Sequence, residues 1–185
     1  MSPLSYLALA VLLGSAPAHA AEFSEVHLAN SNIGFGYKQM NVPLKGAFAK
    51  FNITAHFDPT KPASGSAKID IYLPSIDTGN SDADEEVLGK LWFDTQQYPQ
   101  AHFTTSTIES LGGERYLALG KLTIKGKTLA VSAPFTFKQQ GNTATFDGAL
   151  TLNRLDYAIG VGLWADIATV ANEVSINFHF VASSK

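Results

Sequence analysis

The chain has 185 residues, with 13 basic and 16 acidic side chains, a formal charge of -3 at pH 7 and no Cys. This balance, without any run of basic residues, argues against nucleic acid as a partner and provides no electrostatic attraction to anionic membrane surfaces. Disulfides and thiolate metal sites are excluded, so a core must stabilise the fold alone.

The first segment, residues 1–20, predicts a cleaved secretory signal. Leu4 to Leu13 form a short apolar run, and Ala18-His19-Ala20 resembles a cleavage site with small residues. The run is short for a membrane span, and no basic residue precedes it. We expect a mature chain of residues 21–185, a length that favours one domain.

Most of the mature chain alternates between apolar and polar residues. In "SAKIDIYLP", Ile69 and Ile71 share one side with Ala67 and Leu73, and "NEVSINFHFVA" places Phe178 and Phe180 together. Period-two alternation is typical of strands with one buried face. Turn residues separate these segments, so we expect strands near 24–29, 31–40, 44–57, 64–74, 100–110, 114–125, 128–138, 142–154 and 170–182. This order predicts an all-β fold, an antiparallel sandwich or barrel.

One short helix is expected near residues 82–90. Ser81 or Asp82 can cap it, acidic side chains follow in its first turns, and Gly89 can end it. The aromatic segment "KLWFDTQQYPQAHF", residues 90–103, comes next and cannot continue the helix, because Pro99 interrupts it. We expect Trp92, Phe93 and Tyr98 of this segment to plug one end of a barrel or to line its opening.

The residues give no sign of a reacting centre. No two His of the mature chain have the spacing of a metal pair, and G-x-S-x-G and phosphate-loop patterns are absent. Residues 160–165 match G-x-G-x-x-A in letters, but no βαβ unit surrounds them. His102 is interpreted as a residue of the core or rim, and His179 as a solvated side chain. We expect no enzyme, no metal and no cofactor.

Aromatic residues, in contrast, are abundant: 12 Phe, 6 Tyr and 2 Trp. Many fall on the apolar side of the expected strands, where they can form an ordinary core. A barrel of about eight strands is also wide enough to enclose a slender ligand. The candidate ligand-binding residues are Phe35, Tyr37, Phe51, Ile69, Ile71, Trp92, Phe93, Tyr98, Phe103, Phe135, Phe137, Leu150, Leu152, Arg154, Tyr157, Trp164, Phe178 and Phe180.

Six stretches in order resemble the YceI-like family: "SNIGFGYKQM", "LKGAFAKFNITAHFDP", "PSIDTGNSDADEEV", "WFDTQQYPQAHF", "GKLTIKGKT" and "NRLDYAIG". The resemblance covers residues 22–182. It implies an exported, periplasmic protein with a lipocalin-like antiparallel barrel that binds a polyisoprenoid chain, as of a quinone or another long-chain apolar lipid. A membrane b-type cytochrome as partner and a homodimer are further implications.

Two positions bear on headgroup contacts. Many members of that family carry an Arg-Asp pair and a His in the helix after "SIDTGN", whereas this chain has the acidic "SDADEEVLGK", so we assign no phosphate recognition there. Arg154 in "NRLDYAIG" matches a family position and interrupts an apolar alternation. It either contacts a ligand headgroup at the mouth of the pocket or forms a structural ion pair, with Asp156 as the local candidate.

The expected function is therefore that of an exported carrier or scavenger of an isoprenoid lipid. One alternative is a stress-related structural protein with a filled core. Another is an enzyme that acts on a prenyl lipid, a hydrolase or isomerase, although no nucleophile–base pair supports it.

Overall fold

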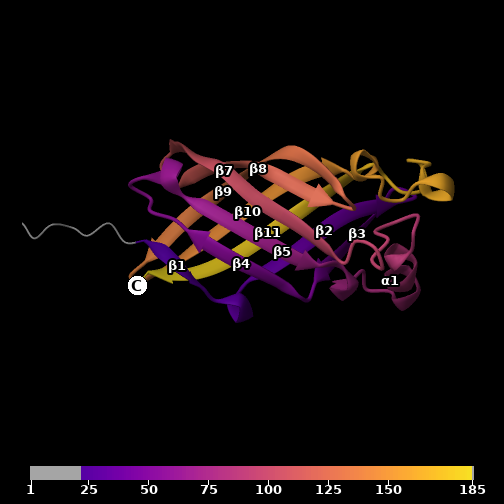
Figure 1. The fold of residues 1–185 in the computed structure, drawn as a ribbon, viewed down its shortest axis with the longest axis horizontal. Helices are drawn as coiled ribbons and strands as arrows, with labels where there is room; N and C mark the ends of the chain where they lie inside the picture. The colour runs from indigo at the N-terminus through magenta and orange to yellow at the C-terminus, as the bar shows by residue number, and fades with distance from the viewer. Residues whose placement is uncertain (1–21, 185) are drawn as a thin grey trace, which may run out of the picture.

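The computed structural model describes residues 22–184, so the predicted signal segment lies outside the described residues. These residues form one curled antiparallel sheet of eleven strands and one α-helix, α1, Ser81–Leu88 (Figure 1). The strands are β1 (Phe23–Val26), β2 (Asn32–Gln39), β3 (Val42–Phe48), β4 (Phe51–His56), β5 (Ser66–Tyr72), β6 (Ile76–Asp77), β7 (Gln100–Gly112), β8 (Arg115–Ile124), β9 (Lys127–Gln140), β10 (Thr143–Asn153) and β11 (Glu173–Ser184).

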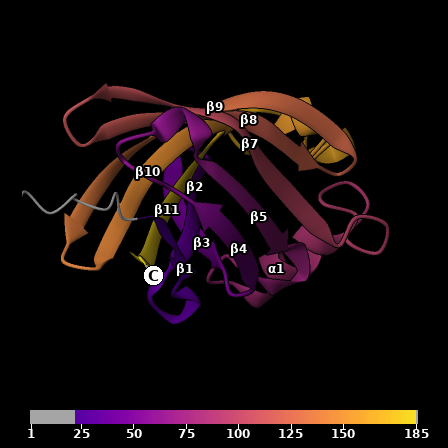
Figure 2. The ribbon, with the colours of Figure 1, turned by 60° about the vertical axis from the view of Figure 1, so that its left-hand side comes forward.

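The sheet curls back on itself, and two connections bring its edges near each other. Its order is β4-β5-β7-β8-β9-β10-β11-β2-β3-β6, and β1 also pairs with β11. The neighbours β3 and β4 lie toward the two ends of this path, yet only Ala49 and Lys50 separate them in the chain. The backbones of Phe23 and Phe57 exchange two hydrogen bonds, of 2.9 and 3.0 Å, which adds a second closure. Figure 2 shows the resulting curl.

The expected antiparallel barrel is therefore confirmed, and the number of strands needs a small correction. Segment 44–57, predicted as one strand, bends between β3 and β4, and segment 64–74 gives β5 and a 3-10 turn before β6. The first bend divides one of the nine expected segments into two strands, and β6 lies outside all nine, so the structure has eleven strands rather than about eight. At the first bend the buried and half-buried positions change from even numbers, ending at Phe48, to odd numbers, starting at Phe51, so the alternation contains a phase shift that a single strand over 44–57 overlooks.

Helix α1 begins at Ser81, one residue before the expected start, and ends at Leu88, before Gly89. Its N-cap is Asn80 rather than Ser81 or Asp82: the Asn80 Oδ1 accepts hydrogen bonds from two backbone N–H groups of the first turn, both at 3.0 Å. Asn is among the preferred residues for this position, because its oxygen satisfies donors that have no partner within the helix.

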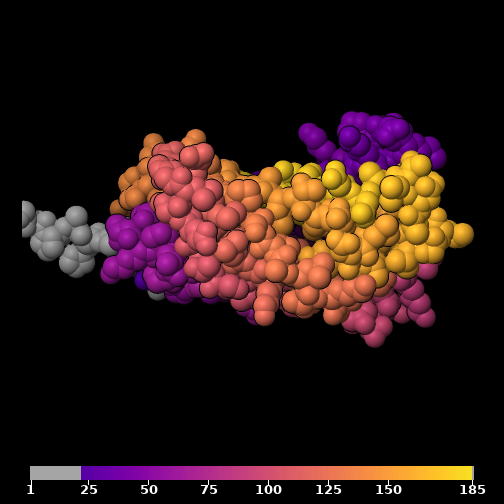
Figure 3. Space-filling model, turned by 90° about the horizontal axis from the view of Figure 1, so that it is seen from above, coloured from indigo at the N-terminus to yellow at the C-terminus, as the bar shows by residue number. Residues whose placement is uncertain are grey.

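The two ends of the barrel differ. At one end lie α1, the tip of the β2–β3 hairpin and the loop 154–172, which joins β10 to β11 (Figure 1). In Figure 3 the yellow and orange C-terminal third, which includes this loop, lies between the violet β2–β3 hairpin and the magenta α1 segment. β1 and the C-terminus lie at the opposite end. We call these the α1 end and the β1 end.

Aromatic rings fill the interior at the β1 end. Phe57 lies at the centre, with its ring centroid 5.1 Å from those of Tyr116 and Phe137 and 5.5 Å from that of Phe146. Edge-to-face and tilted pairs at such distances are favourable beyond the area that they bury. We call this group the aromatic floor: Phe23, Phe57, Tyr116, Phe135, Phe137 and Phe146.

Three glycines on the inner wall accept rings that lie against the backbone. Gly46 is paired with Phe35 and Gly148 with Phe178, and a Cβ added at either would come within 2.3 Å of the ring of that Phe. Gly120 accommodates Phe103 in the same way, with a closest ring atom at 2.7 Å. Because these rings occupy the space above glycine, they cover the wall without filling the centre of the barrel.

We expect Gly148→Ala to destabilise the protein by about 1–3 kcal/mol, since the new methyl would also lie 2.5 Å from the backbone oxygen of Pro134, which cannot rotate away. Urea unfolding followed by circular dichroism measures the loss. The control is Ala149→Val at the adjacent exposed position, expected to stay within about 0.5 kcal/mol. Equal stability of the two variants would contradict the role of the bare backbone at Gly148.

Candidate ligand-binding cavity

The barrel encloses a cavity with a volume of about 520 Å³. Its wall is almost entirely apolar and comes from strands on all sides of the sheet, while part of the aromatic floor, including Phe57 and Phe135, bounds it toward the β1 end. A volume in the range of small-molecule sites, an apolar wall and a few polar groups at one end are typical of a site for an apolar ligand.

Most of the residues proposed from the sequence share this wall. The structure brings together rings from the strands with those of the segment after α1 and of the loop 154–172. Those that line the cavity are Phe35, Tyr37, Ile69, Ile71, Trp92, Phe93, Phe103, Phe135, Leu150, Leu152, Arg154, Trp164, Phe178 and Phe180.

Four proposed residues do not line the cavity, and their expected positions need correction. Phe51 is partly buried and packs against the core at the start of β4. Tyr98 lies beside the β8–β9 turn, where its ring approaches Gly126. Phe137 belongs to the aromatic floor, and Tyr157 is buried in a 3-10 turn of the loop 154–172. Packing within the protein explains Phe51, Tyr98 and Phe137 without a ligand, whereas the hydroxyl of Tyr157 is buried with no hydrogen-bond partner among the described residues.

Sequence reasoning missed several parts of the wall. Val174 and Ile176 line the cavity and share the parity of Phe178, so the alternation of β11 could have identified them. The polar residues at the α1 end, among them Gln39 and Thr78, lie in turns and loops or at strand ends, where periodicity gives no signal. Only the folded chain brings them to one place.

The α1 end forms the mouth of the cavity, because the lining residues there are exposed or half-buried. The mouth residues are Gln39, Thr78, Asp82, Glu86 and Trp164. One hydrogen bond crosses the mouth: the indole Nε1 of Trp164, in the loop 154–172, donates to Oε1 of Glu86, in α1, at 2.8 Å.

Arg154 holds the loop 154–172 together from inside. The residue is 2% exposed, and its guanidinium donates five hydrogen bonds, all to backbone carbonyl oxygens of this loop. The acceptors are the carbonyl oxygens of Ile159, Gly160, Trp164, Val170 and Ala171, at 2.6–3.1 Å. An Arg side chain has five N–H donors, so none is left over.

The expected ion pair of Arg154 is therefore replaced by hydrogen bonds to carbonyl oxygens, and its contact with a headgroup stays a prediction. No ion pair to Arg154 exists among the described residues, and Asp156 instead accepts from the side chain of Asn153 at 3.3 Å. A headgroup contact would require Arg154 to release a carbonyl. Burial lowers the pKa of the guanidinium, but carbonyl dipoles and the ring of Trp92, 5.6 Å away, compensate its charge.

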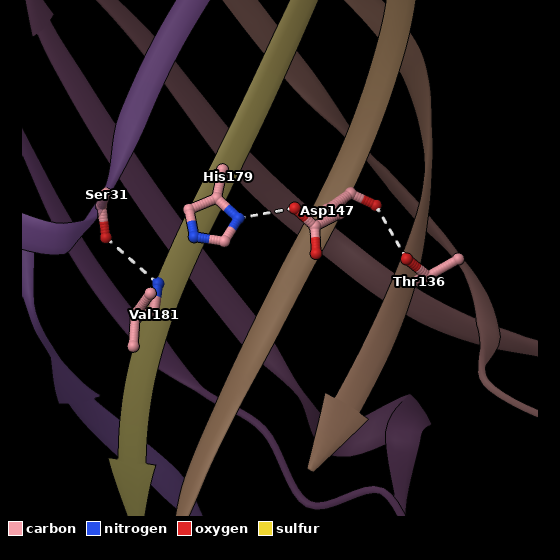
Figure 4. A network of polar contacts seen from close by, with 5 residues as sticks. All are labelled: Ser31, Thr136, Asp147, His179 and Val181. Atoms are coloured by element: carbon pink, nitrogen blue, oxygen red, sulfur yellow. Dashed lines mark hydrogen bonds and ion pairs between the residues drawn. The ribbon is translucent and has the colours of Figure 1, made fainter. Parts of the chain in front are cut away.

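Histidine–carboxylate pairs lie on the outer face of the barrel. His179 Nδ1 lies 2.6 Å from Asp147 Oδ1 across β11 and β10, and the Asp147 carbonyl accepts a hydrogen bond from Thr136 (Figure 4). Ser31 appears in the same view, but its hydroxyl accepts from the Val181 backbone N–H and donates to a carbonyl. Figure 4 thus shows a structural network between strands, and His179 is half-buried and paired rather than simply solvated.

His102 is placed similarly, with its Nδ1 2.6 Å from Oδ1 of Asp70. This hydrogen bond is the main cause that lowers the pKa of the Asp70 carboxyl. The Nε2 atom of His27 lies 3.0 Å from the hydroxyl of Ser183, on the exposed surface at the β1 end. None of these side chains lines the cavity.

Within residues 22–184, no group of three or more His, Asp or Glu side chains is arranged to hold a metal ion. The described part of the chain also contains no helix that is long and apolar enough to span a membrane.

Comparisons with known proteins agree with this fold. The sequence profile of the YceI-like domain matches residues 25–182. A UPF0312 protein of Photorhabdus laumondii is 32% identical over 130 residues, which are 69% of this chain and 67% of the relative. A UPF0312 protein of Azotobacter vinelandii is 24% identical over 94% of this chain and 93% of its own.

Solved structures give the same result. BcnA of Burkholderia cenocepacia is 48% identical with a TM-score of 0.84, over 86% of this chain and all of its own. A polyisoprenoid binding domain from Saccharophagus degradans superposes with a TM-score of 0.67 over 90% of this chain and all of its own. At 16% identity this second likeness shows the fold alone.

Proposed function

This chain belongs to the YceI-like family, and we propose that it is a binding protein that holds a long isoprenoid chain, of a quinone or another prenyl lipid, in the cavity of its barrel. The observation that carries the proposal is the apolar cavity of about 520 Å³ inside the barrel, which is lined almost entirely by aromatic and aliphatic side chains. Such a cavity also speaks against the alternative of a filled core.

Burial of the lipid supplies enough free energy for useful binding. Removing about 500 Å² of lipid surface from water contributes about 12 kcal/mol at roughly 25 cal/mol per Å². Association costs about 4–15 kcal/mol in lost freedom of motion. An enclosed chain can therefore bind with few polar contacts, whereas a shallow groove would leave too much of it in water.

The neighbouring domain from Saccharophagus degradans supports an isoprenoid as the ligand, because its name gives polyisoprenoid binding. The signal pattern of residues 1–20 supports a periplasmic location, where we propose a role as carrier or scavenger. For a quinone cargo, a membrane b-type cytochrome is the partner that we propose. A homodimer stays a prediction.

The family and its neighbours favour a binding protein over an enzyme. His102, the base that we considered for such an enzyme, contacts Asp70 on the outer face and does not line the cavity. Turnover of a prenyl substrate that is lost on His102→Ala would revive the enzyme alternative.

Native mass spectrometry of the protein purified from a bacterial host tests the binding proposal. We expect a co-purified apolar ligand of defined mass and, after delipidation, uptake of added ubiquinone at one molecule per chain. Purified protein that carries no lipid and takes up no quinone under any loading condition would overturn the proposal.

Trp164→Phe tests the contact across the mouth. The variant keeps an aromatic ring but loses the N–H that donates to Glu86 at 2.8 Å. A hydrogen bond to a charged acceptor contributes about 1.5–3 kcal/mol when buried and less at this exposed site. We therefore expect release of bound quinone to accelerate several-fold, as measured by stopped-flow transfer to vesicles. Tyr72→Phe, which changes an exposed ring that does not line the cavity, should leave release unchanged.

A further inference from the structure

The mouth of the cavity carries a concentration of negative charge. Helix α1 has four carboxylates, of Asp82, Asp84, Glu85 and Glu86, and no basic residue. Asp82 and Glu86 line the cavity itself. Glu86 is held at the rim by its hydrogen bond from Trp164. A polar headgroup that rests at the mouth would therefore lie beside at least two carboxylates.

Within residues 22–184, no cation of the lining is free to offset this charge. Arg154 is the one basic residue among the described residues that line the cavity, and its five donors are all bound to carbonyl oxygens. Lys125 lies near the same loop but is not part of the lining, and its Nζ donates to the carbonyl oxygens of Lys90 and Ala158. An anionic headgroup would thus meet carboxylates with no ion-pair partner.

Neutral hydrogen-bonding groups are present at the same place. Tyr37 and Gln39, in β2, line the cavity, and neither side chain has a hydrogen-bond partner among the described residues. The pKa of the Tyr37 phenol is raised, first by burial and then by the charge of Asp84, so the field of α1 reaches this side of the cavity. The phenol stays protonated and can donate to a carbonyl or hydroxyl oxygen.

The shape of the cavity fixes the direction of the ligand. The aromatic floor fills the β1 end, and the polar groups gather at the α1 end. An apolar tail placed toward the floor leaves its polar head among Tyr37, Gln39, Asp82 and Glu86, where water can also reach it.

We propose that the mouth discriminates by headgroup charge: the site takes isoprenoid lipids whose head is an uncharged alcohol, phenol or quinone and rejects those whose head is a phosphate or carboxylate. This inference rests on the proposed function. Close like charges at a partly desolvated rim repel each other and are less screened by salt than fully exposed ones. The tail gives the affinity, and α1 selects the head.

The test compares geranylgeraniol with geranylgeranyl phosphate, which share one tail, on delipidated protein in the same mild detergent. We expect the alcohol to bind at least tenfold more tightly. The double variant Asp82→Asn, Glu86→Gln should tighten phosphate binding several-fold and thereby reduce the ratio of alcohol affinity to phosphate affinity by at least the same factor. The amide introduced by Glu86→Gln keeps an oxygen that can accept from the Trp164 indole, so the rim is preserved.

A control variant, Glu109→Gln with Glu114→Gln, makes the same change in net charge on exposed positions of β7 and the β7–β8 turn, outside the cavity lining. It should leave both affinities unchanged. Phosphate binding equal to or tighter than alcohol binding, or a preference that survives in the double variant, would overturn the inference alone. Binding of neither lipid would overturn the proposed function and this inference with it.

Discussion

Replacement of Arg154 by Met is expected to lower the free energy of unfolding by about 3–5 kcal/mol, the range for removing one partner of a buried charged network. The variant leaves five carbonyl oxygens of the loop 154–172 without their donor, and a buried polar group that loses its partner is costly. Met keeps the apolar stem but no donor. Urea unfolding measures the global loss, and hydrogen exchange shows whether the loop opens first.

Two comparisons make the result specific to the donors. Arg115→Met removes the other Arg of the chain, an exposed side chain whose hydrogen bond to the Leu111 carbonyl is long, at 3.5 Å, and should cost no more than about 0.5 kcal/mol. Arg154→Lys keeps the positive charge but offers three donors in place of five, so its stability should lie between the wild type and the Met variant. Equal stability of Arg154→Met and Arg115→Met would refute the role of Arg154 as the organiser of the mouth.

The barrel could be predicted because each strand carries its own signal. Alternation places Ile69, Ile71, Phe178 and Phe180 on one face, and in the structure all of them line the same cavity. A strand that is buried on one face must repeat every two residues, so the fold class follows from local patterns. At Ala49 and Lys50 two exposed residues follow one another and the alternation changes phase, so the single strand expected over 44–57 missed a break that the pattern does carry.

The hollow interior could not be predicted from those patterns. A ring on the inner face reads as ordinary core, and only the pairing of strands shows that Phe35 and Phe178 lie against Gly46 and Gly148. That pairing depends on register between segments distant in sequence. Glycines that face aromatic residues in neighbouring expected strands would have indicated where rings lie flat against the backbone and leave the interior of the barrel open.

The chemistry of the mouth was also beyond sequence reasoning. Arg154 draws attention as a charge among apolar residues, and a nearby carboxylate is the simplest partner to expect. Its actual partners are backbone carbonyls, which every residue has and which therefore leave no trace in the sequence. The loop 154–172 turns back on this guanidinium with the help of Ala158 and Gly160, whose φ angles are positive.

Leu150→Trp is expected to weaken isoprenoid binding by roughly 50- to 100-fold while leaving the fold intact. Leu150 lies in β10, lines the cavity and packs beside the aromatic floor, so a larger ring there occupies the deep part that we assign to the lipid tail. Excluding about 100 Å² of tail surface removes about 2.5 kcal/mol at roughly 25 cal/mol per Å². Because the ring enters a cavity rather than packed core, we expect the free energy of unfolding to change by less than about 1.5 kcal/mol.

Ala149→Trp is the matched control, since the adjacent residue is exposed on the outer face and the same side chain is introduced. Quinone bound per chain, measured by extraction and mass spectrometry, should fall for Leu150→Trp and stay at the wild-type level for Ala149→Trp. A Leu150→Trp protein that is folded and still binds the full-length lipid with wild-type affinity would place the tail outside this cavity. Loss of binding in both variants would point to the outer face instead, because only the direction of the side chain distinguishes the two positions.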